Sequence, residues 1–354
     1  MGEIILRNYP FDNYKILFKP KTGLFIRIED NGFPEPFWAP SGPELLDISI
    51  TNWCSRSCSF CYKNSDKNGM HMAFEDYERI MVEAKANNVF QVALGGGNPN
   101  QHPQFCEILE VTRKYGIVPS YTTNGDGLNK KILEATSKYC GAVAVSAYEP
   151  YSNMNKILTK FFSFNVKTNI HFLLDCNTIE VALQWMKKPP NFLKNINAII
   201  FLNYKPVGKN RTENFLLKNN TSFRELFQLV TSESYDFKIG FDSCSVSGLV
   251  SSQNGIDFNF IEPCDGARFS AYISENLLVY PCSFLGESHK GESLRNKSLR
   301  EIWNKSSLFL EARNRLNSNK CNACSFQEKC FNGCPFFPEI NLCNNTFLET
   351  KSIV

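Results

Sequence analysis

Three cysteines near the amino terminus, Cys54, Cys58 and Cys61, follow the strand-like run Asp47–Thr51 in the order Cys-x3-Cys-x2-Cys. Three thiolates this close together can hold three irons of a four-iron cluster and leave the fourth iron without a protein ligand. An open iron can bind a small molecule and pass it an electron, whereas a closed cluster only carries electrons. A structural zinc site needs four N or S ligands, and the next Cys or His along the chain is His71. We therefore interpret the three cysteines as an iron–sulfur motif.

Composition excludes several classes of partner. The 354 residues include 38 Lys and Arg against 35 Asp and Glu, a balance that does not indicate nucleic acid or an anionic membrane surface. Residues 1–25 lack the apolar core of a signal peptide, and no run approaches the ~18 apolar residues of a membrane span. The sequence therefore predicts a cytoplasmic protein. In a reducing cytosol its 14 cysteines indicate metal or redox work and not disulfides.

The chain divides into three segments by its pattern of predicted elements. Residues 1–45 form a lead-in with a possible hairpin, which is too short for an independent domain. Residues 46–235 alternate strand-like runs with amphipathic helical stretches, whereas residues 236–354 are mostly loop-rich and cysteine-rich. The strands predicted in the middle segment are Asp47–Thr51, Phe90–Leu94, Val118–Thr123, Ala142–Ala147, Thr168–Leu174 and Ala198–Tyr204. A strand at Asp236–Asp242 and a helix at Leu299–Arg313 are predicted in the last segment.

Six β-α units with short connections predict an α/β fold with a parallel sheet and helices on one side of it, because parallel strands need crossover helices. Six units, where a full barrel has eight, indicate a partial (β/α)6 barrel. Ligands of such folds bind at the carboxyl ends of the strands. The last segment has too little apolar periodicity to fold on a hydrophobic core alone, so metal clusters would supply the missing stability.

Three predicted strands end in small or polar residues. Gly95-Gly96-Gly97-Asn98 follows the second strand, Thr122-Thr123-Asn124-Gly125 ends the third, and Ser146-Ala147-Tyr148 ends the fourth. Glycines let a backbone approach a ligand closely. The alternative is ordinary turn chemistry, since glycines and small polar residues close many strands.

A second cysteine motif lies near the carboxyl terminus. Cys321, Cys324, Cys330 and Cys334 form Cys-x2-Cys-x5-Cys-x3-Cys. Cys343 follows it, and Cys244, Cys264 and Cys282 precede it. A zinc ribbon would use two Cys-x2-Cys knuckles, so the spacing disfavours zinc.

These motifs resemble the radical SAM superfamily followed by a SPASM domain, over residues 45 to 345. The resemblance implies a partial TIM-like (β/α)6 barrel and then a small loop-rich iron–sulfur domain. It also implies three [4Fe-4S] clusters, of which one binds S-adenosyl-L-methionine and two are auxiliary. In this family SAM is cleaved reductively to a 5′-deoxyadenosyl radical, which abstracts hydrogen from the substrate.

The resemblance assigns roles residue by residue. Phe60 would cover the adenine, although a buried core aromatic is the alternative. Asn98 stands where the family usually has Glu. The segment Gly95-Gly96-Gly97-Asn98 is therefore expected to bind SAM through its backbone. The residues expected to bind SAM are Phe60, Gly95, Gly96, Gly97, Asn98, Thr123, Asn124, Ser146, Asn169 and Tyr204.

The resemblance also assigns the cluster ligands. Cys54, Cys58 and Cys61 would hold the SAM-binding cluster. Cys264, Cys282 and Cys334 would hold the first auxiliary cluster, and Cys321, Cys324, Cys330 and Cys343 the second. The chain has no cysteine a few residues before Cys264, where the family often places a fourth ligand. Either Cys244 closes that cluster, or one of its irons stays open. Leu277 stands where the family usually has glycine, beside Asn276, which tolerates a left-handed turn.

Family frequency makes a ribosomally made peptide or protein the expected substrate. The alternatives are oxidation of a small molecule of the porphyrin or sugar type and a non-catalytic iron–sulfur electron-transfer protein. Because the lead-in is short, we expect a separate recognition protein or direct substrate binding, with a flavodoxin- or ferredoxin-type electron donor. No catalytic acid or base stands out. The charged residues near strand ends are interpreted as solvated surface groups, namely Asp126, Asp175, Asp242 and Lys205.

Overall fold

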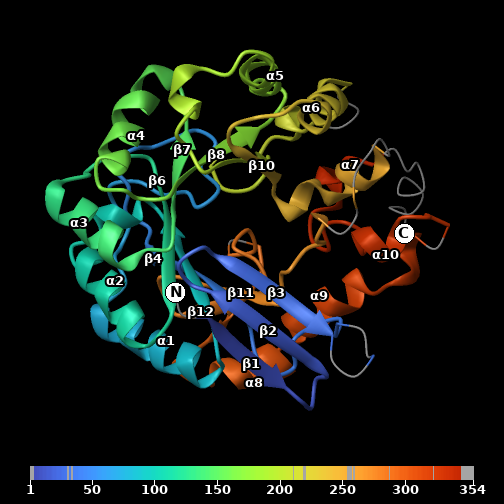
Figure 1. Cartoon of the computed structure of the whole chain (residues 1–354). Coiled ribbons are helices and arrows are strands. Elements are labelled where there is room, and N and C mark those ends of the chain that lie inside the picture. Colours follow the sequence, from blue (N-terminus) through green and yellow to red (C-terminus); the bar gives the residue numbers. More distant parts are fainter. Residues whose placement is uncertain are drawn as a thin grey trace.

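The chain is described by a computed structural model, which contains two β-sheets (Figure 1). The described residues are 4–29, 32, 35–209, 211–217, 221–252, 257, 260–286, 288–321 and 323–343. Within these ranges, no helix is long and apolar enough to cross a membrane.

The larger sheet forms the predicted partial barrel. Its seven strands β4 to β10 pair in parallel in chain order. They are β4 (Leu45–Thr51), β5 (Gln91–Gly96), β6 (Val118–Thr123), β7 (Val143–Ala147), β8 (Thr168–Leu174), β9 (Ala198–Asn203) and β10 (Lys238–Phe241). The helices that connect them are α1 (Phe74–Ala86), α2 (Phe105–Lys114), α3 (Lys130–Tyr139), α4 (Met154–Phe162), α5 (Ile179–Lys187) and α6 (Thr221–Ser232). Figure 1 shows these helices in an arc outside the strands, so the expected arrangement is confirmed.

Apolar spacing explains the barrel core. In α1 the buried residues recur three or four positions apart, at Tyr77, Ile80, Met81 and Ala84. In β4, Leu46, Ile48 and Ile50 are at most 1% exposed and face the helices, whereas Asp47 and Ser49 alternate to the barrel interior. Each large apolar side chain buried in this way contributes about 1.5–3 kcal/mol relative to an exposed one.

The barrel sheet extends beyond the six predicted strands. β10 pairs in parallel with β9, and β11 (Ser270–Ile273) pairs in parallel with β4. The hairpin strands β12 (Leu278–Tyr280) and β13 (Glu292–Ser293) then continue the sheet in antiparallel order. Strands on both sides of residue 236, the predicted domain boundary, therefore share one hydrogen-bonded sheet.

The lead-in is a three-stranded antiparallel sheet, with one strand more than the predicted hairpin. Its strands are β1 (Ile5–Tyr9), β2 (Tyr14–Lys19) and β3 (Leu24–Glu29). Their buried face packs on Phe90, Val118 and Phe269, which stand at the amino ends of β5, β6 and β11. The Phe18 and Phe90 ring centroids, for example, are 5.7 Å apart. The small sheet thus covers the amino-terminal side of the barrel, opposite the edge where ligands are expected.

The last segment is loop-rich, as predicted, but its long helix is divided. The structure has α8 (Leu299–Lys305) and α9 (Ser307–Leu316), separated by Ser306, whose backbone is extended at ψ 129°. Two shorter helices are α7 (Val246–Ser251) and α10 (Gln327–Cys330). Leu277 itself adopts the left-handed backbone, at φ +63°, which agrees with the glycine expected at that place and not with a turn at Asn276.

Candidate functional site

The loop that carries Cys54, Cys58 and Cys61 begins where β4 ends, at the carboxyl edge of the barrel. Backbone hydrogen bonds shape it, with the Cys61 N–H donating to the Cys58 carbonyl at 3.2 Å. Burial raises the pKa of the Cys58 thiol, and the nearby Cys61 and Cys54 thiols raise it further. The structure therefore brings the three sulfurs close enough to influence one another. We call residues 54–61 the cluster loop.

An ion pair ties the cluster loop to the end of β6. The Arg56 guanidinium donates to both carboxylate oxygens of Asp126, each at 2.8 Å, and the Ser55 hydroxyl donates to the same carboxylate at 3.0 Å. Hydrogen bonding from Arg56 lowers the pKa of Asp126, so this carboxylate stays charged at neutral pH. Asp126 is thus a fixed partner of the loop, while its side chain stays 36% exposed, as expected for a group near the surface.

Two residues expected at the SAM site have protein partners for their side chains. Asn98 is fully buried, and its side-chain oxygen accepts from the Thr123 hydroxyl at 3.1 Å and the Asn124 N–H at 3.2 Å. Its amide nitrogen donates to the Asp126 carbonyl at 3.0 Å. Thr123 also donates to Asn100 at 2.6 Å. These side chains hold the ends of β5 and β6 together, which leaves the backbone to meet a ligand.

Asn124 reaches the cluster loop directly. Its amide nitrogen lies 3.7 Å from the Cys54 sulfur, to which it donates. A hydrogen bond to a cluster sulfur stabilises the negative charge that builds up on reduction. Asn124 is therefore placed to influence how easily a cluster at this loop accepts an electron.

The three glycines at the carboxyl end of β5 serve different purposes. A Cβ atom on Gly96 would lie 2.0 Å from the Thr51 carbonyl oxygen, and one on Gly97 would lie 2.1 Å from the Trp53 carbonyl oxygen. Both glycines are thus required by the close passage of the chain that leads into the cluster loop. A Cβ on Gly95 would meet nothing within 4 Å. Of the three, Gly95 is the one that leaves open space for a ligand to approach the backbone.

An aromatic pair lies beside the cluster loop. The rings of Phe60 and Tyr148 are 4.9 Å apart. Burial raises the pKa of Tyr148 to about 12, and the thiols of the cluster loop add to this rise, which places Tyr148 near them. Ser146, which lies on β7 two residues before Tyr148, forms a hydrogen bond with the Tyr148 side chain. Tyr148 was absent from the expected SAM contacts, although an aromatic directly after a polar strand end was a visible signal.

Two further residues expected to bind SAM have side chains with partners inside the protein. Asn169 stands at the amino end of β8, and its side chain accepts from the Asn197 amide at 2.7 Å. It is therefore not gathered with the residues at the carboxyl edge. Tyr204 is 2% exposed, and its hydroxyl donates to the Thr212 carbonyl at 3.2 Å. Further along the same segment, Gly208 and Lys209 contact the cluster loop.

Gly208 packs directly against the cluster loop. It has φ +79°, and a Cβ there would lie 2.1 Å from the Cys61 carbonyl oxygen. The next N–H, of Lys209, donates to that same oxygen at 3.0 Å. The segment after β9 therefore fixes the backbone position of Cys61.

We expect Gly208→Ala to displace Cys61 and to lower the iron bound at the cluster loop. The left-handed backbone alone costs an alanine about 1–2 kcal/mol, and the clash adds to that cost. Gly116→Ala is the matched control, because Gly116 has the same φ of +79° but nothing within 4 Å of its Cβ position. Iron per chain and the thermal unfolding midpoint are compared. Equal iron content in the two variants would contradict a role for Gly208 in positioning the loop.

A second group of thiols lies between the barrel and the last segment. Cys244 follows β10, Cys264 precedes β11 and Cys282 follows β12. Burial raises the pKa of Cys282 well above its usual value, and the Cys244, Cys264 and Cys334 thiols raise it further. Each of the other three thiols is thus within electrostatic reach of Cys282. We call them the first auxiliary group.

The remaining four cysteines form a third group. Burial raises the pKa of Cys330 to about 12, with further contributions from Cys343, Cys321 and Cys324. Cys330 ends the short helix α10, Cys321 ends a 3-10 helix (Asn319–Cys321), and Cys324 and Cys343 lie in loops. We call these four thiols the second auxiliary group.

The numbers of thiols in the three groups match iron–sulfur clusters. Four thiolates close a four-iron cluster, and three leave one iron open. Among the described residues, no three His, Cys, Asp or Glu side chains converge on a site for a single metal ion. The cluster loop has the three thiols of an open cluster, and each auxiliary group has the four of a closed one.

Two charged residues expected at the surface, Lys205 and Asp175, are buried. Lys205 is 6% exposed and pairs with Asp242 at 3.0 Å. Asp175 is 5% exposed and accepts from the Asn177 and Thr178 N–H groups at 2.8 and 2.9 Å, at the start of α5. Their interpretation as solvated surface groups was wrong, because packing after the strand ends covers them.

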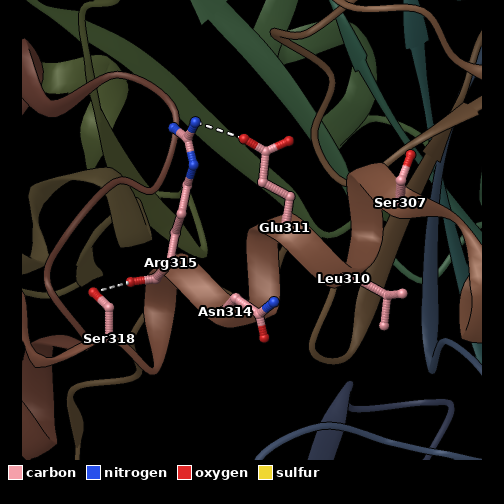
Figure 2. A pocket seen from close by; sticks show the side chains of 6 residues that line it. All are labelled: Ser307, Leu310, Glu311, Asn314, Arg315 and Ser318. Atoms are coloured by element: carbon pink, nitrogen blue, oxygen red, sulfur yellow. Dashed lines mark hydrogen bonds and ion pairs between the residues drawn. The ribbon is translucent and has the colours of Figure 1, made fainter.

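A surface hollow elsewhere on the protein is lined by few reactive side chains. It lies along α9 and is lined by Ser307, Leu310, Glu311, Asn314, Arg315 and Ser318 (Figure 2). Its two charged side chains, Glu311 and Arg315, pair with each other at 2.6 Å. None of the six carries a thiol or imidazole, so we place the function at the cysteine groups.

Two family models match parts of the chain. Residues 48–161 match the radical SAM superfamily, and residues 264–326 match the SPASM iron–sulfur cluster-binding domain. Mycofactocin maturase MftC of Mycobacterium tuberculosis is 22% identical over 310 residues, which cover 82% of this chain and 78% of that protein.

Two solved structures share the fold over nearly the whole chain. Streptococcus suis SuiB bound to S-adenosylmethionine has a TM-score of 0.74 at 18% identity, covering 99% of both chains. SuiB bound to its precursor peptide SuiA has a TM-score of 0.72 at 17% identity, covering 98% of both chains. With the two domain matches, these findings lead to one assignment: the chain belongs to the radical SAM superfamily of enzymes and carries a SPASM domain.

Proposed function

We propose that this enzyme modifies a ribosomally made peptide or protein by SAM-dependent radical chemistry. The observation that carries the proposal is the open three-thiol loop at the carboxyl edge of the barrel, together with two separate four-thiol groups. The relatives support the choice of substrate, since MftC is a maturase and SuiB binds a precursor peptide. An electron carrier needs neither an open thiol loop nor the free space beside Gly95.

We propose that Cys54, Cys58 and Cys61 hold the SAM-binding cluster and that the two auxiliary groups hold one cluster each. When bound, the first cluster would supply the electron that cleaves SAM to a 5′-deoxyadenosyl radical. The chain's own residues position the cofactor. Gly95 offers its backbone, Phe60 and Tyr148 offer an aromatic surface, and Asn124 hydrogen-bonds Cys54.

Two partners complete the proposal. The reductive step needs an electron donor of the flavodoxin or ferredoxin type, and a separate recognition protein would present the peptide. We also propose a cytoplasmic location, because free thiols that must bind iron persist best in a reducing compartment. The barrel (residues 46–235) and the iron–sulfur domain (residues 236–354) remain our functional division, although they share one sheet.

Anaerobic reconstitution tests the proposal in one preparation. We expect about twelve irons per chain, taking ~4 per cluster, and formation of 5′-deoxyadenosine under dithionite. A short peptide encoded beside the gene should then lose hydrogen mass or gain a cross-link only when SAM is present. Zinc without iron in the protein would overturn the cluster and radical assignments together. Turnover of a porphyrin or sugar, with no peptide modified, would instead replace the substrate class.

A further inference from the structure

Lys205 is a buried cation beside the first auxiliary group. Its side chain is 4% exposed, and its ammonium donates to the Asp242 carboxylate at 3.0 Å and to the Asn203 carbonyl at 2.8 Å. Asp242 is the better-exposed partner, at 18%, and also accepts from the Ser245 hydroxyl at 2.9 Å. The pair is therefore held in one geometry by several hydrogen bonds.

Two residues that contact Lys205 are close in sequence to cysteines of the first auxiliary group. Asp242 stands two residues before Cys244, and Phe284 stands two residues after Cys282. The Lys205 ammonium is 4.4 Å from the centre of the Phe284 ring. It thus lies between the segments that carry Cys244 and Cys282. Burial raises the pKa of Cys244, and the Lys205 ammonium opposes that rise, as expected for a cation near a thiolate.

Aromatic rings keep water away from this charge. Phe284 contacts the Tyr62 ring at 4.8 Å, and Tyr62 directly follows Cys61. A fixed charge acts more strongly in such a poorly solvated place than at the surface, because less water screens it. Lys205 is therefore well placed to influence the reduction potential of a neighbouring cluster.

We propose that Lys205 raises the reduction potential of the cluster held by Cys244, Cys264, Cys282 and Cys334, and that Asp242 moderates this effect. Reduction adds one electron and so one negative charge to the cluster, which a nearby cation stabilises and a nearby carboxylate opposes. Lys205 would thereby favour this cluster as an electron acceptor. The inference rests on the auxiliary cluster of the proposed function.

Two single variants that break the same ion pair give opposite expectations. Lys205→Met should lower the midpoint potential of this cluster, whereas Asp242→Asn should raise it. We expect each to change the ratio of reduced to oxidised cluster at a fixed potential about tenfold, which is about 59 mV for a one-electron couple. The potentials are measured by dithionite titration with electron paramagnetic resonance on the reconstituted full chain. Loosening of the structure would move both variants in one direction, so opposite shifts identify an electrostatic effect.

Three controls make the measurement specific. Lys205→Arg keeps the charge and should stay near the wild-type potential. Lys238→Met removes a lysine from an exposed position at the far end of β10 and should change nothing. The cluster of the second auxiliary group is an internal reference, which the variants should leave unmoved.

The possible outcomes separate the two assignments. If the wild type shows no signal from a cluster at the first auxiliary group, the cluster assignment fails. If the cluster forms and neither Lys205→Met nor Asp242→Asn shifts its potential, or both shift it alike, the role of Lys205 is refuted. If the Lys205→Met variant does not assemble this cluster, a second comparison is made. The double variant Lys205→Met/Asp242→Asn is then compared with Asp242→Asn alone, because neither protein leaves an unpaired carboxylate at position 242. There the loss of Lys205 should still lower the potential, and an unchanged potential would refute the proposal.

Discussion

Replacing Cys54, Cys58 and Cys61 together by Ala is expected to abolish the formation of 5′-deoxyadenosine. These three thiols are the proposed anchor of the only open iron that the motif predicts, so SAM would have no iron to bind. About four of about twelve irons should be lost. The two auxiliary groups should keep their iron, because they share no cysteine with the cluster loop. Iron analysis and product chromatography under dithionite check both halves of this expectation.

The chain offers a matched control for this variant. Cys106, Cys140 and Cys176 are three further cysteines, partly buried and outside the three thiol groups. Their triple replacement by Ala removes the same number of thiols and should leave both the iron content and SAM cleavage near the wild-type level. Undiminished 5′-deoxyadenosine from the cluster-loop variant would show that SAM binds elsewhere.

The barrel could be predicted from the sequence because its signals are local. The stripe of Tyr77, Ile80, Met81 and Ala84 specifies the buried face of α1 without reference to any other part of the chain. The pairing of β11 with β4 could not be predicted in this way. It joins Ser270 to Leu45, and such distant pairing depends on tertiary packing and not on periodicity.

The same distinction applies to the site. The cysteine spacing and the glycines were readable, yet only the structure separates Gly95, which faces open space, from Gly96 and Gly97, which face backbone. Lys205 and Asp242 looked like ordinary charges at strand ends. Lys205 is buried because Phe284, from a segment distant in the sequence, packs over its ammonium. Local pattern therefore predicted where the chemistry lies, and long-range packing determined the environment of its charges.

Cys244 is the ligand that the sequence left open, and the structure gives a reason to test it. Its thiol lies after β10 with a pKa raised to about 12 by burial, and the Cys264 thiol contributes to that rise. The pKa of Cys334 is likewise raised to about 12, mainly by burial and then by the Cys244 thiol. A cysteine that only filled space in the core would not need two other thiols, Cys264 and Cys334, near it. We propose Cys244 as the fourth ligand of the first auxiliary cluster.

Cys244→Ala is therefore expected to lose about one cluster's iron, ~4 per chain, or to change the resonance spectrum of that cluster. Cys140→Ala is the control for removal of a thiol as such, since burial raises the pKa of Cys140 too but no other cysteine contributes to the rise. It should leave iron and spectrum unchanged. If Cys244→Ala behaves like Cys140→Ala, then Cys244 is not a ligand. The fourth iron would then be open, and substrate or solvent could reach it.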